Sequence, residues 1–212
     1  MTGLFFVFEG IDGSGKSTQA TNFTNYLFLK EKYKNVLLTR EPYKELKIRE
    51  ILLEEDPYSN AENLTRLFVE DRRKHLNDLI LPCLKKNIDV VCDRYFFSTF
   101  AYQYAQGVSF DKISELHKGI LIPDMIFLID VSPKVAFERM KKDSKRKMEK
   151  KFEQIDFIEK VRNNYHFLSK MKDFNVFVIN GEKSEDEVFK QIIYFYEKFT
   201  KKKTNLNFFN HF

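Results

Sequence analysis

A glycine-rich octapeptide at positions 10–17 limits the fold of this chain more than any other feature. It reads Gly10-Ile-Asp-Gly-Ser-Gly-Lys-Ser17 and matches the P-loop pattern, in which two glycines flank four residues and are followed by Lys and Ser. An apolar run at 4–8 precedes it, and Ala20, Phe23 and Leu27 follow at helical spacing. A strand, a glycine loop and a helix in this order predict a phosphate-binding loop. The alternative is a glycine turn that only leads into a helix.

The residue types of this loop predict how a nucleotide would be held. Glycines permit backbone conformations closed to other residues, so that successive N–H groups converge on phosphate oxygens at a helix N-terminus. Lys16 is expected to reach the β- and γ-phosphates of ATP, and the Ser17 hydroxyl to bind Mg²⁺. The predicted nucleotide-binding set is Gly10, Gly13, Ser14, Gly15, Lys16, Ser17 and Thr18.

Asp12 is an unusual residue for such a loop, because its carboxylate repels a polyphosphate. We interpret it as a contact for a sugar hydroxyl, or as a group that orients a second substrate. The alternative is a solvated turn residue.

Strand and helix patterns alternate along the rest of the chain. Short apolar runs predict buried strands at 4–8, 36–39, 89–92, 125–129 and 175–179, with helical periodicity between them. This alternation predicts the α/β class, with a parallel sheet covered by helices on both faces. The length of 212 residues predicts one domain over 1–212. The stretch 201–212 has no clear period and is interpreted as a frayed or lightly docked tail.

The net charge of +5 is concentrated in one segment. Seven Lys or Arg and two acidic residues lie between positions 141 and 151, so the remainder of the chain is balanced. A broad basic face for nucleic acid is therefore not predicted, and the segment is expected to meet a bound polyphosphate. No run approaches the roughly 18 apolar residues of a membrane span, which predicts a soluble, cytoplasmic protein without a membrane partner.

Cysteine and histidine usage predicts no metal site of the zinc type. Cys83 and Cys92 lack metal-ligand spacing, and both lie in apolar segments, so we expect both to be buried and reduced. The four histidines are scattered along the chain and are interpreted as surface or packing residues.

Two charged residues follow the predicted strand at 89–92. Asp93 and Arg94 come directly after it, and the carboxyl ends of strands in open parallel sheets are where ligands bind. Asp93 is expected to organise Mg²⁺ or its water shell, and Arg94 to bind a phosphate. An Asp-Arg turn pair on the surface is the alternative.

A predicted helix over 64–84 carries charge within its apolar stripe, at Asp71 and Arg72. Inward charge needs a partner, and a ligand is one candidate partner for Arg72. Phe68, one turn earlier, offers an aromatic face for stacking. A direct contact between Asp71 and Arg72, or a slight rotation of the helix, is the competing interpretation.

Several linked motifs together resemble thymidylate kinase. They are Phe8-Glu9-Gly10, the P-loop with Asp12, Thr39-Arg40-Glu41-Pro42, Phe68 with Arg72, Asp93-Arg94-Tyr95, Ser98-Thr99 and Ala101-Tyr102-Gln103. The similarity runs from about residue 4 to residue 199 and includes Lys151-Phe152-Glu153 and Val161-Arg162 with Tyr165.

The resemblance implies a fold and an activity. The fold is a P-loop kinase with a five-stranded parallel sheet in the order 2-3-1-4-5 and a mobile lid, here about 141–153. The activity is transfer of the γ-phosphoryl group of ATP to dTMP, with Mg²⁺ as cofactor, and the expected assembly is a homodimer.

The resemblance also implies roles for residues around the acceptor. Asp12 would contact the sugar, Arg40 and Arg94 the phosphate, Phe68 would stack on thymine, and Arg72 would bind the base edge. Thr99, Tyr102 and Gln103 fall where the family reads the base and disfavours a ribose hydroxyl, and Ser98 completes the predicted substrate-binding set.

The source of catalytic positive charge differs within the family. The interior of this P-loop holds no basic residue, so the lid is expected to supply it, through Arg146 or through Arg139 just before the basic segment. With Lys16, Asp12 and Arg94 these form the predicted catalytic set. Two other functions stay open: a related nucleotide kinase with another base preference, and a P-loop NTPase that acts with nucleic acid.

Overall fold

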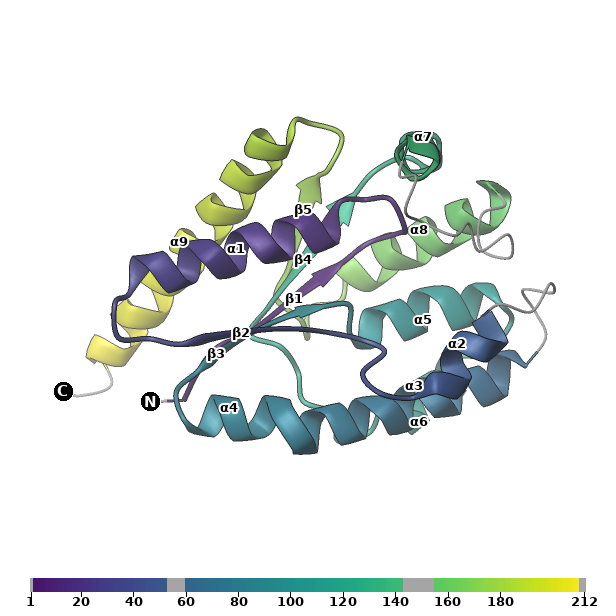
Figure 1. The fold of residues 1–212 in the computed structure, drawn as a ribbon, viewed down its shortest axis with the longest axis horizontal. Coiled ribbons are helices and arrows are strands. Elements are labelled where there is room, and N and C mark those ends of the chain that lie inside the picture. The colour runs from purple at the N-terminus through teal and green to yellow at the C-terminus, as the bar shows by residue number, and fades with distance from the viewer. Residues whose placement is uncertain (1, 53–59, 143–154, 210–212) are drawn as a thin grey trace.

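The computed structural model describes residues 2–52, 60–142 and 155–209, and side chains as far as residue 201. Its sheet is fully parallel, in the order β2-β3-β1-β4-β5, as predicted (Figure 1). The strands are β1 (Phe5–Glu9), β2 (Val36–Arg40), β3 (Asp89–Asp93), β4 (Met125–Asp130) and β5 (Val176–Asn180).

Helices connect the strands in chain order. They are α1 (Lys16–Lys30), α2 (Leu46–Leu52), α3 (Ala61–His75), the π-helical turn η1 (Leu76–Ile80), α4 (Leu81–Lys85), α5 (Phe96–Ala105), α6 (Phe110–Leu116), α7 (Pro133–Lys142), α8 (Ile155–Ser169) and α9 (Glu185–Phe209). The helix expected over 64–84 is thus one continuous rod of α3, η1 and α4 (Figure 1).

The core has two layers, one on each face of the sheet. Side chains of β1 contribute to both layers in turn, because successive side chains of a strand point to opposite faces. Phe6 and Phe8 pack under α1 and α9, together with Phe23 of α1. Phe5 and Val7 face the other layer, which α4, α5 and α8 cover. Figure 1 shows α1 and α9 on one side of the sheet and the rod of α3 and α4 on the other.

Each strand ends one residue later than its apolar run predicts. The last residues are polar, yet the parallel pairing continues through them, with Arg40 opposite Asp93 and Asp130 opposite Asn180. Backbone hydrogen bonding extends a strand regardless of side-chain polarity. The consequence is a row of polar side chains at the carboxyl edge of the sheet.

Two further expectations need correction. The predicted tail at 201–212 is helical through Phe209, because α9 continues and no Gly or Pro interrupts it; residues 210–212 lie outside the described part. Cys83 is half-buried rather than buried, whereas Cys92 is buried, and both thiols are free. Within the described residues, no helix has the length and apolar character needed to cross a membrane.

Candidate active site

The P-loop turns between β1 and α1 in a conformation that its glycines make possible. Gly10 and Gly13 have φ angles of 145° and 78°, in the region that side chains rarely adopt. A Cβ atom on Gly10 would lie 2.5 Å from the carbonyl oxygen of Ile129, and one on Gly13 would lie 2.4 Å from that of Ala136. The loop therefore packs against β4 and α7 with backbone alone, and α1 begins directly at Lys16.

Lys16 and Asp12 lie next to each other within this loop. The Lys16 side chain is buried, and its Nζ donates a 3.3 Å hydrogen bond to the carbonyl oxygen of Ile11. The same nitrogen lies 3.6 Å from Oδ1 of Asp12. The Lys16 side chain is thus buried, whereas the Asp12 side chain stays 27% exposed.

Ser17 and Asp93 join the start of α1 to the end of β3. The Ser17 hydroxyl donates a 2.5 Å hydrogen bond to Oδ2 of Asp93. The other carboxylate oxygen, Oδ1, is buried and has no hydrogen-bond partner among the described residues. An unpaired buried carboxylate oxygen is costly, so this atom is suited to a ligand or a cation.

Arg94 connects the P-loop to α5. Its Nη2 donates a 2.6 Å hydrogen bond to Oδ1 of Asp12, and its Nη1 donates to Oγ of Ser98 over 3.1 Å. The hydroxyl of Tyr102 donates to Oδ2 of Asp12 over 2.9 Å. Burial and the Asp12 carboxylate raise the pKa of Tyr102, so the phenol stays protonated and remains a donor.

Glu9, at the end of β1, binds the residues next to Arg94. Its carboxylate accepts hydrogen bonds from the backbone N–H of Tyr95 at 2.8 Å, the Ser98 hydroxyl at 2.6 Å and the Tyr165 hydroxyl at 3.0 Å. Burial raises the pKa of Glu9, and the hydrogen bond from Ser98 and the charge of Arg94 oppose that shift. The Glu9 carboxylate of β1 thus links the start of α5 to α8, and Ser98, one of its donors, also binds Arg94.

A pocket of about 210 Å³ opens beside the P-loop. Eight of the nine predicted substrate-binding residues line it: Asp12, Phe68, Arg72, Arg94, Ser98, Thr99, Tyr102 and Gln103. Arg40 does not line it; it ends β2 with an exposed side chain. Glu41, Pro42, Leu52 and Tyr95 also line the pocket, although sequence reasoning gave them no role in the site.

Arg72 has protein partners, but Asp71 is not among them, so the interpretation that these two neighbours pair with each other is wrong. Its Nε donates to Oε2 of Glu41 over 2.7 Å, deep in the protein. Asp71 does not pair with Arg72; its carboxylate accepts backbone N–H groups of the loop after β2, from Lys44 at 2.8 Å and Glu45 at 3.0 Å. Glu41 directly follows β2, which is half-buried to exposed rather than buried as predicted.

Arg139 joins the P-loop to the loop after β5. Its Nη1 donates to the carbonyl oxygen of Ser14 over 3.3 Å, and its Nη2 donates to that of Gly181 over 2.8 Å. Lys141 and Lys142 form the end of α7. Arg146 and the remainder of the predicted lid, at 143–153, lie outside the described residues.

Comparison with known proteins agrees with this geometry. The family model for thymidylate kinase matches residues 8–192. The thymidylate kinase of Thermosipho africanus is 42% identical over 202 residues, covering 92% of this chain and 98% of that protein. This chain belongs to the thymidylate kinase family.

Further thymidylate kinases match over similar lengths. That of Mesomycoplasma hyopneumoniae (strain J) is 39% identical over 208 residues, covering 92% of this chain and 97% of the relative. The crystal structure of thymidylate kinase from Ehrlichia chaffeensis superposes with a TM-score of 0.71 at 30% identity, covering 91% of this chain and 98% of that one. The sheet order predicted from the resemblance is therefore that of a thymidylate kinase fold.

Proposed function

We propose that the P-loop of this chain binds ATP while the adjoining pocket binds dTMP. Asp12 carries the proposal, because this P-loop residue is also part of the pocket wall. A phosphate held by Arg94 would lie beside a phosphate held by Lys16. An oxygen of the dTMP phosphate attacks the γ-phosphorus, the bond to the β-phosphate breaks, and dTDP and ADP result.

The polar atoms at the inner end of the pocket favour a thymine base. Oε1 of Gln103 is buried and has no hydrogen-bond partner among the described residues. Such an acceptor suits the N3–H donor of thymine, whereas cytosine presents an acceptor at that position. Arg72 supplies a donor for a pyrimidine carbonyl, and Phe68 supplies an aromatic face in the same pocket.

The phosphate and sugar of dTMP are proposed to bind in the part of the pocket that Asp12 and Arg94 line. Arg94 is the proposed phosphate ligand, with Arg40 approaching from the end of β2. Ser98 acts through Arg94, since its hydroxyl bonds Arg94 and Glu9. Asp12 is proposed to accept from the sugar hydroxyl, and Tyr102 with Thr99 closes the wall that a ribose hydroxyl would meet.

Magnesium is proposed as the cofactor of the donor side. Ser17 and Asp93 present a hydroxyl and a carboxylate, and one buried oxygen of that carboxylate has no partner in the described part of the chain. Such oxygen donors are of the hard type that Mg²⁺ prefers. When bound, the ion neutralises charge on the β- and γ-phosphates. Lys16 and a lid arginine, Arg139 or Arg146, are proposed to supply the remaining positive charge.

A substrate panel tests this function. The rate of ADP formation is measured with dTMP, dUMP, UMP, CMP and dGMP, with Lys16→Ala as the inactive control. The highest kcat/KM is expected for dTMP. Higher specificity for UMP, CMP or dGMP would overturn the acceptor assignment. ATP hydrolysis stimulated by nucleic acid, without dTMP phosphorylation, would point to the nucleic-acid alternative.

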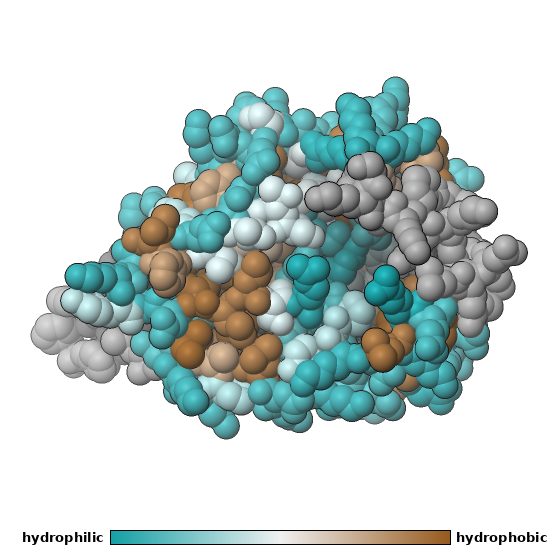
Figure 2. Space-filling model, viewed as in Figure 1, coloured by the Kyte–Doolittle hydropathy of each residue, from teal (hydrophilic) through white to brown (hydrophobic). Residues whose placement is uncertain are grey.

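Two further properties are proposed: a cytoplasmic location and a homodimer. The dimer is supported by a hydrophobic patch over β2 in Figure 2, where Leu38 is 39% exposed and Val36 and Leu37 are half-buried. Light scattering of the purified protein measures its mass, and a monomer at micromolar concentration would contradict the dimer.

A further inference from the structure

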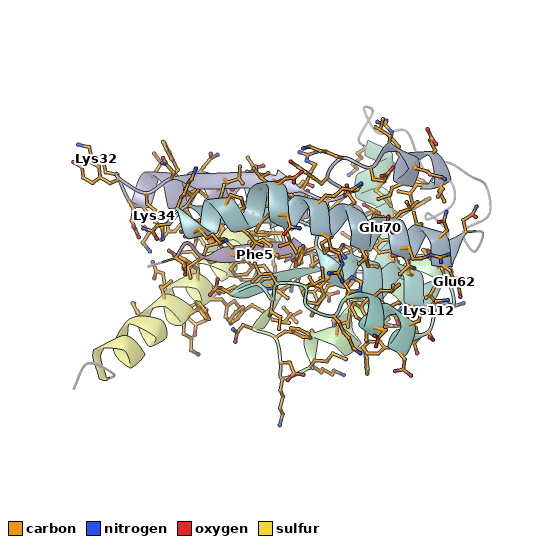
Figure 3. The ribbon with its side chains drawn as sticks, turned by 90° about the horizontal axis from the view of Figure 1, so that it is seen from below. Phe5, Lys32, Lys34, Glu62, Glu70 and Lys112 are labelled. Carbon is orange, nitrogen blue, oxygen red and sulfur yellow. The ribbon has the colours of Figure 1, made fainter. Side chains whose placement is uncertain are left out.

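His117 lies behind the pocket, where α6 docks against α3. Its ring is buried between Phe96 and Phe100, whose centroids lie 6.3 and 5.0 Å from that of the imidazole. The docking is also secured outside the core. Figure 3 shows Glu62 and Lys112 at the same end of the molecule, and these residues form a 2.6 Å ion pair.

The hydrogen bonds of His117 determine its tautomer. Nδ1 lies 2.7 Å from the carbonyl oxygen of Ile113, which can only accept, so Nδ1 carries the proton. Nε2 lies 2.7 Å from Nη1 of Arg72, which can only donate, so Nε2 presents its lone pair. Burial and the charge of Arg72 lower the pKa of His117 to about 3, in agreement with a neutral ring.

The donors of Arg72 can then be assigned. Nε donates to Oε2 of Glu41, and Nη2 lies 2.7 Å from the same oxygen and donates to Oγ1 of Thr99 over 3.1 Å. One N–H of Nη1 binds His117. An arginine has five N–H donors, so one N–H of Nη1 is left without a partner among the described residues. Arg72 also lines the pocket beside the P-loop.

We propose that His117 is a positioning residue for the base: its Nε2 fixes the guanidinium of Arg72 so that the remaining Nη1–H meets the pyrimidine carbonyl. This inference rests on the proposed function. Glu41 fixes the Nε side of the guanidinium, and His117 fixes the opposite side. Without His117, Arg72 keeps its charge and its ion pair but loses the contact that orients Nη1.

The test compares His117→Leu with His117→Gln. Leucine removes the acceptor, whereas the amide oxygen of glutamine reaches about as far from the backbone as Nε2 and can accept from Nη1. His117→Leu is expected to raise the KM for dTMP about tenfold, with kcat and the KM for ATP within about twofold. The preference for dTMP over dCMP should fall, and His117→Gln should restore both values.

Arg73→Ala is the matched control. Arg73 donates to the carbonyl oxygens of Leu116 at 3.0 Å and Lys118 at 3.1 Å, so it holds the same segment from the solvent side. This variant is expected to lower thermal stability without changing the dTMP to dCMP preference. The proposal is overturned if Arg73→Ala shifts that preference as His117→Leu does, or if folded His117→Leu keeps the wild-type KM.

A measurement on the unmodified enzyme covers the case in which His117→Leu does not fold. Nitrogen-15 NMR of the imidazole is expected to show a protonated Nδ1 and an unprotonated Nε2 from about pH 5.5 to about pH 8. A protonated Nε2 would overturn the proposal. Failure of the proposed function would look different, because the wild-type enzyme itself would then not phosphorylate dTMP.

Discussion

Asp12 and Arg94 join the P-loop to the wall of the adjoining pocket: Nη2 of Arg94 lies 2.6 Å from Oδ1 of Asp12, across 82 positions of sequence. The carboxylate thus orients the arginine that is proposed to hold the acceptor phosphate. This pairing also explains how an acid can be accommodated in a loop that binds polyphosphate.

Removing the charge of Asp12 is expected to impair acceptor use. Asp12→Asn keeps the size of the side chain but weakens the hydrogen bonds from Arg94 and Tyr102, so kcat/KM for dTMP should fall about 10- to 100-fold. Steady-state kinetics at saturating ATP measure this. Asp111→Asn, on the exposed first turn of α6, is the control; an equal loss in both variants would speak against a specific role.

The cation site is tested through the Mg²⁺ dependence of the rate. Asp93→Asn is expected to raise the Mg²⁺ concentration for half-maximal activity by about tenfold or more, because a neutral amide replaces the charged ligand. A chelator should abolish turnover, and added Mg²⁺ should restore it. The exposed Asp173→Asn serves as the control. Unchanged Mg²⁺ dependence in Asp93→Asn would exclude this carboxylate as a ligand.

Phe68 is expected to act on the acceptor rather than on the donor. Phe68→Ala removes the aromatic face from the pocket, so the KM for dTMP should rise about tenfold while the KM for ATP stays the same. Leu67→Ala is the control, because Leu67 packs against the same small core cluster but does not line the pocket. If Leu67→Ala raises the KM for dTMP equally, loss of packing accounts for the effect.

The lid contribution is tested with two arginines. At least one of Arg139→Ala and Arg146→Ala is expected to lower kcat about 100-fold, since positive charge near the transferring group stabilises the transition state. Lys134→Ala, at the exposed start of α7, is the control. Full turnover in both arginine variants would refute a basic lid.

The buried carboxyl of Glu9 should give stability a defined pH dependence. Burial raises its folded-state pKa above the usual 4.5, so the folded state holds a proton that the unfolded state has released. The contribution of Glu9 to the free energy of unfolding therefore falls as pH rises from 4.5 through the raised pKa, with a slope of at most about 1.4 kcal/mol per pH unit.

Urea unfolding of the wild type and of Glu9→Gln between about pH 4 and about pH 8 measures this difference. The unfolding free energy of the wild type minus that of the variant should decrease with pH. A difference that stays flat or increases would contradict the raised pKa.

The fold could be predicted because its signals are local. The P-loop spacing, the apolar runs and the helical periodicity each occupy one short segment, and right-handed crossovers then leave few topologies. The strand ends were the weaker part of the prediction. Arg40, Asp93 and Asp130 belong to strands because their backbones continue the ladder, which side-chain polarity does not reveal.

The partners of the buried charges could not be predicted in the same way. Asp71 and Arg72 are adjacent in sequence, yet Asp71 binds the loop after β2 while Arg72 pairs with Glu41. Neighbouring positions on a helix point about 100° apart, so their surroundings depend on which elements pack on each side. The burial of Cys83 was mispredicted for a similar reason: its side of α4 is only partly covered by other elements, so the thiol is half-buried.

The sequence by itself determined that this chain has a phosphate-binding loop at the head of a helix, a parallel α/β sheet and the motifs of the thymidylate kinase family. Only the tertiary structure decided that Arg72 lies between Glu41 and His117, 31 and 45 positions away. Local patterns encode backbone conformation, whereas the partner of a buried polar group is set by whichever distant element packs within hydrogen-bond reach.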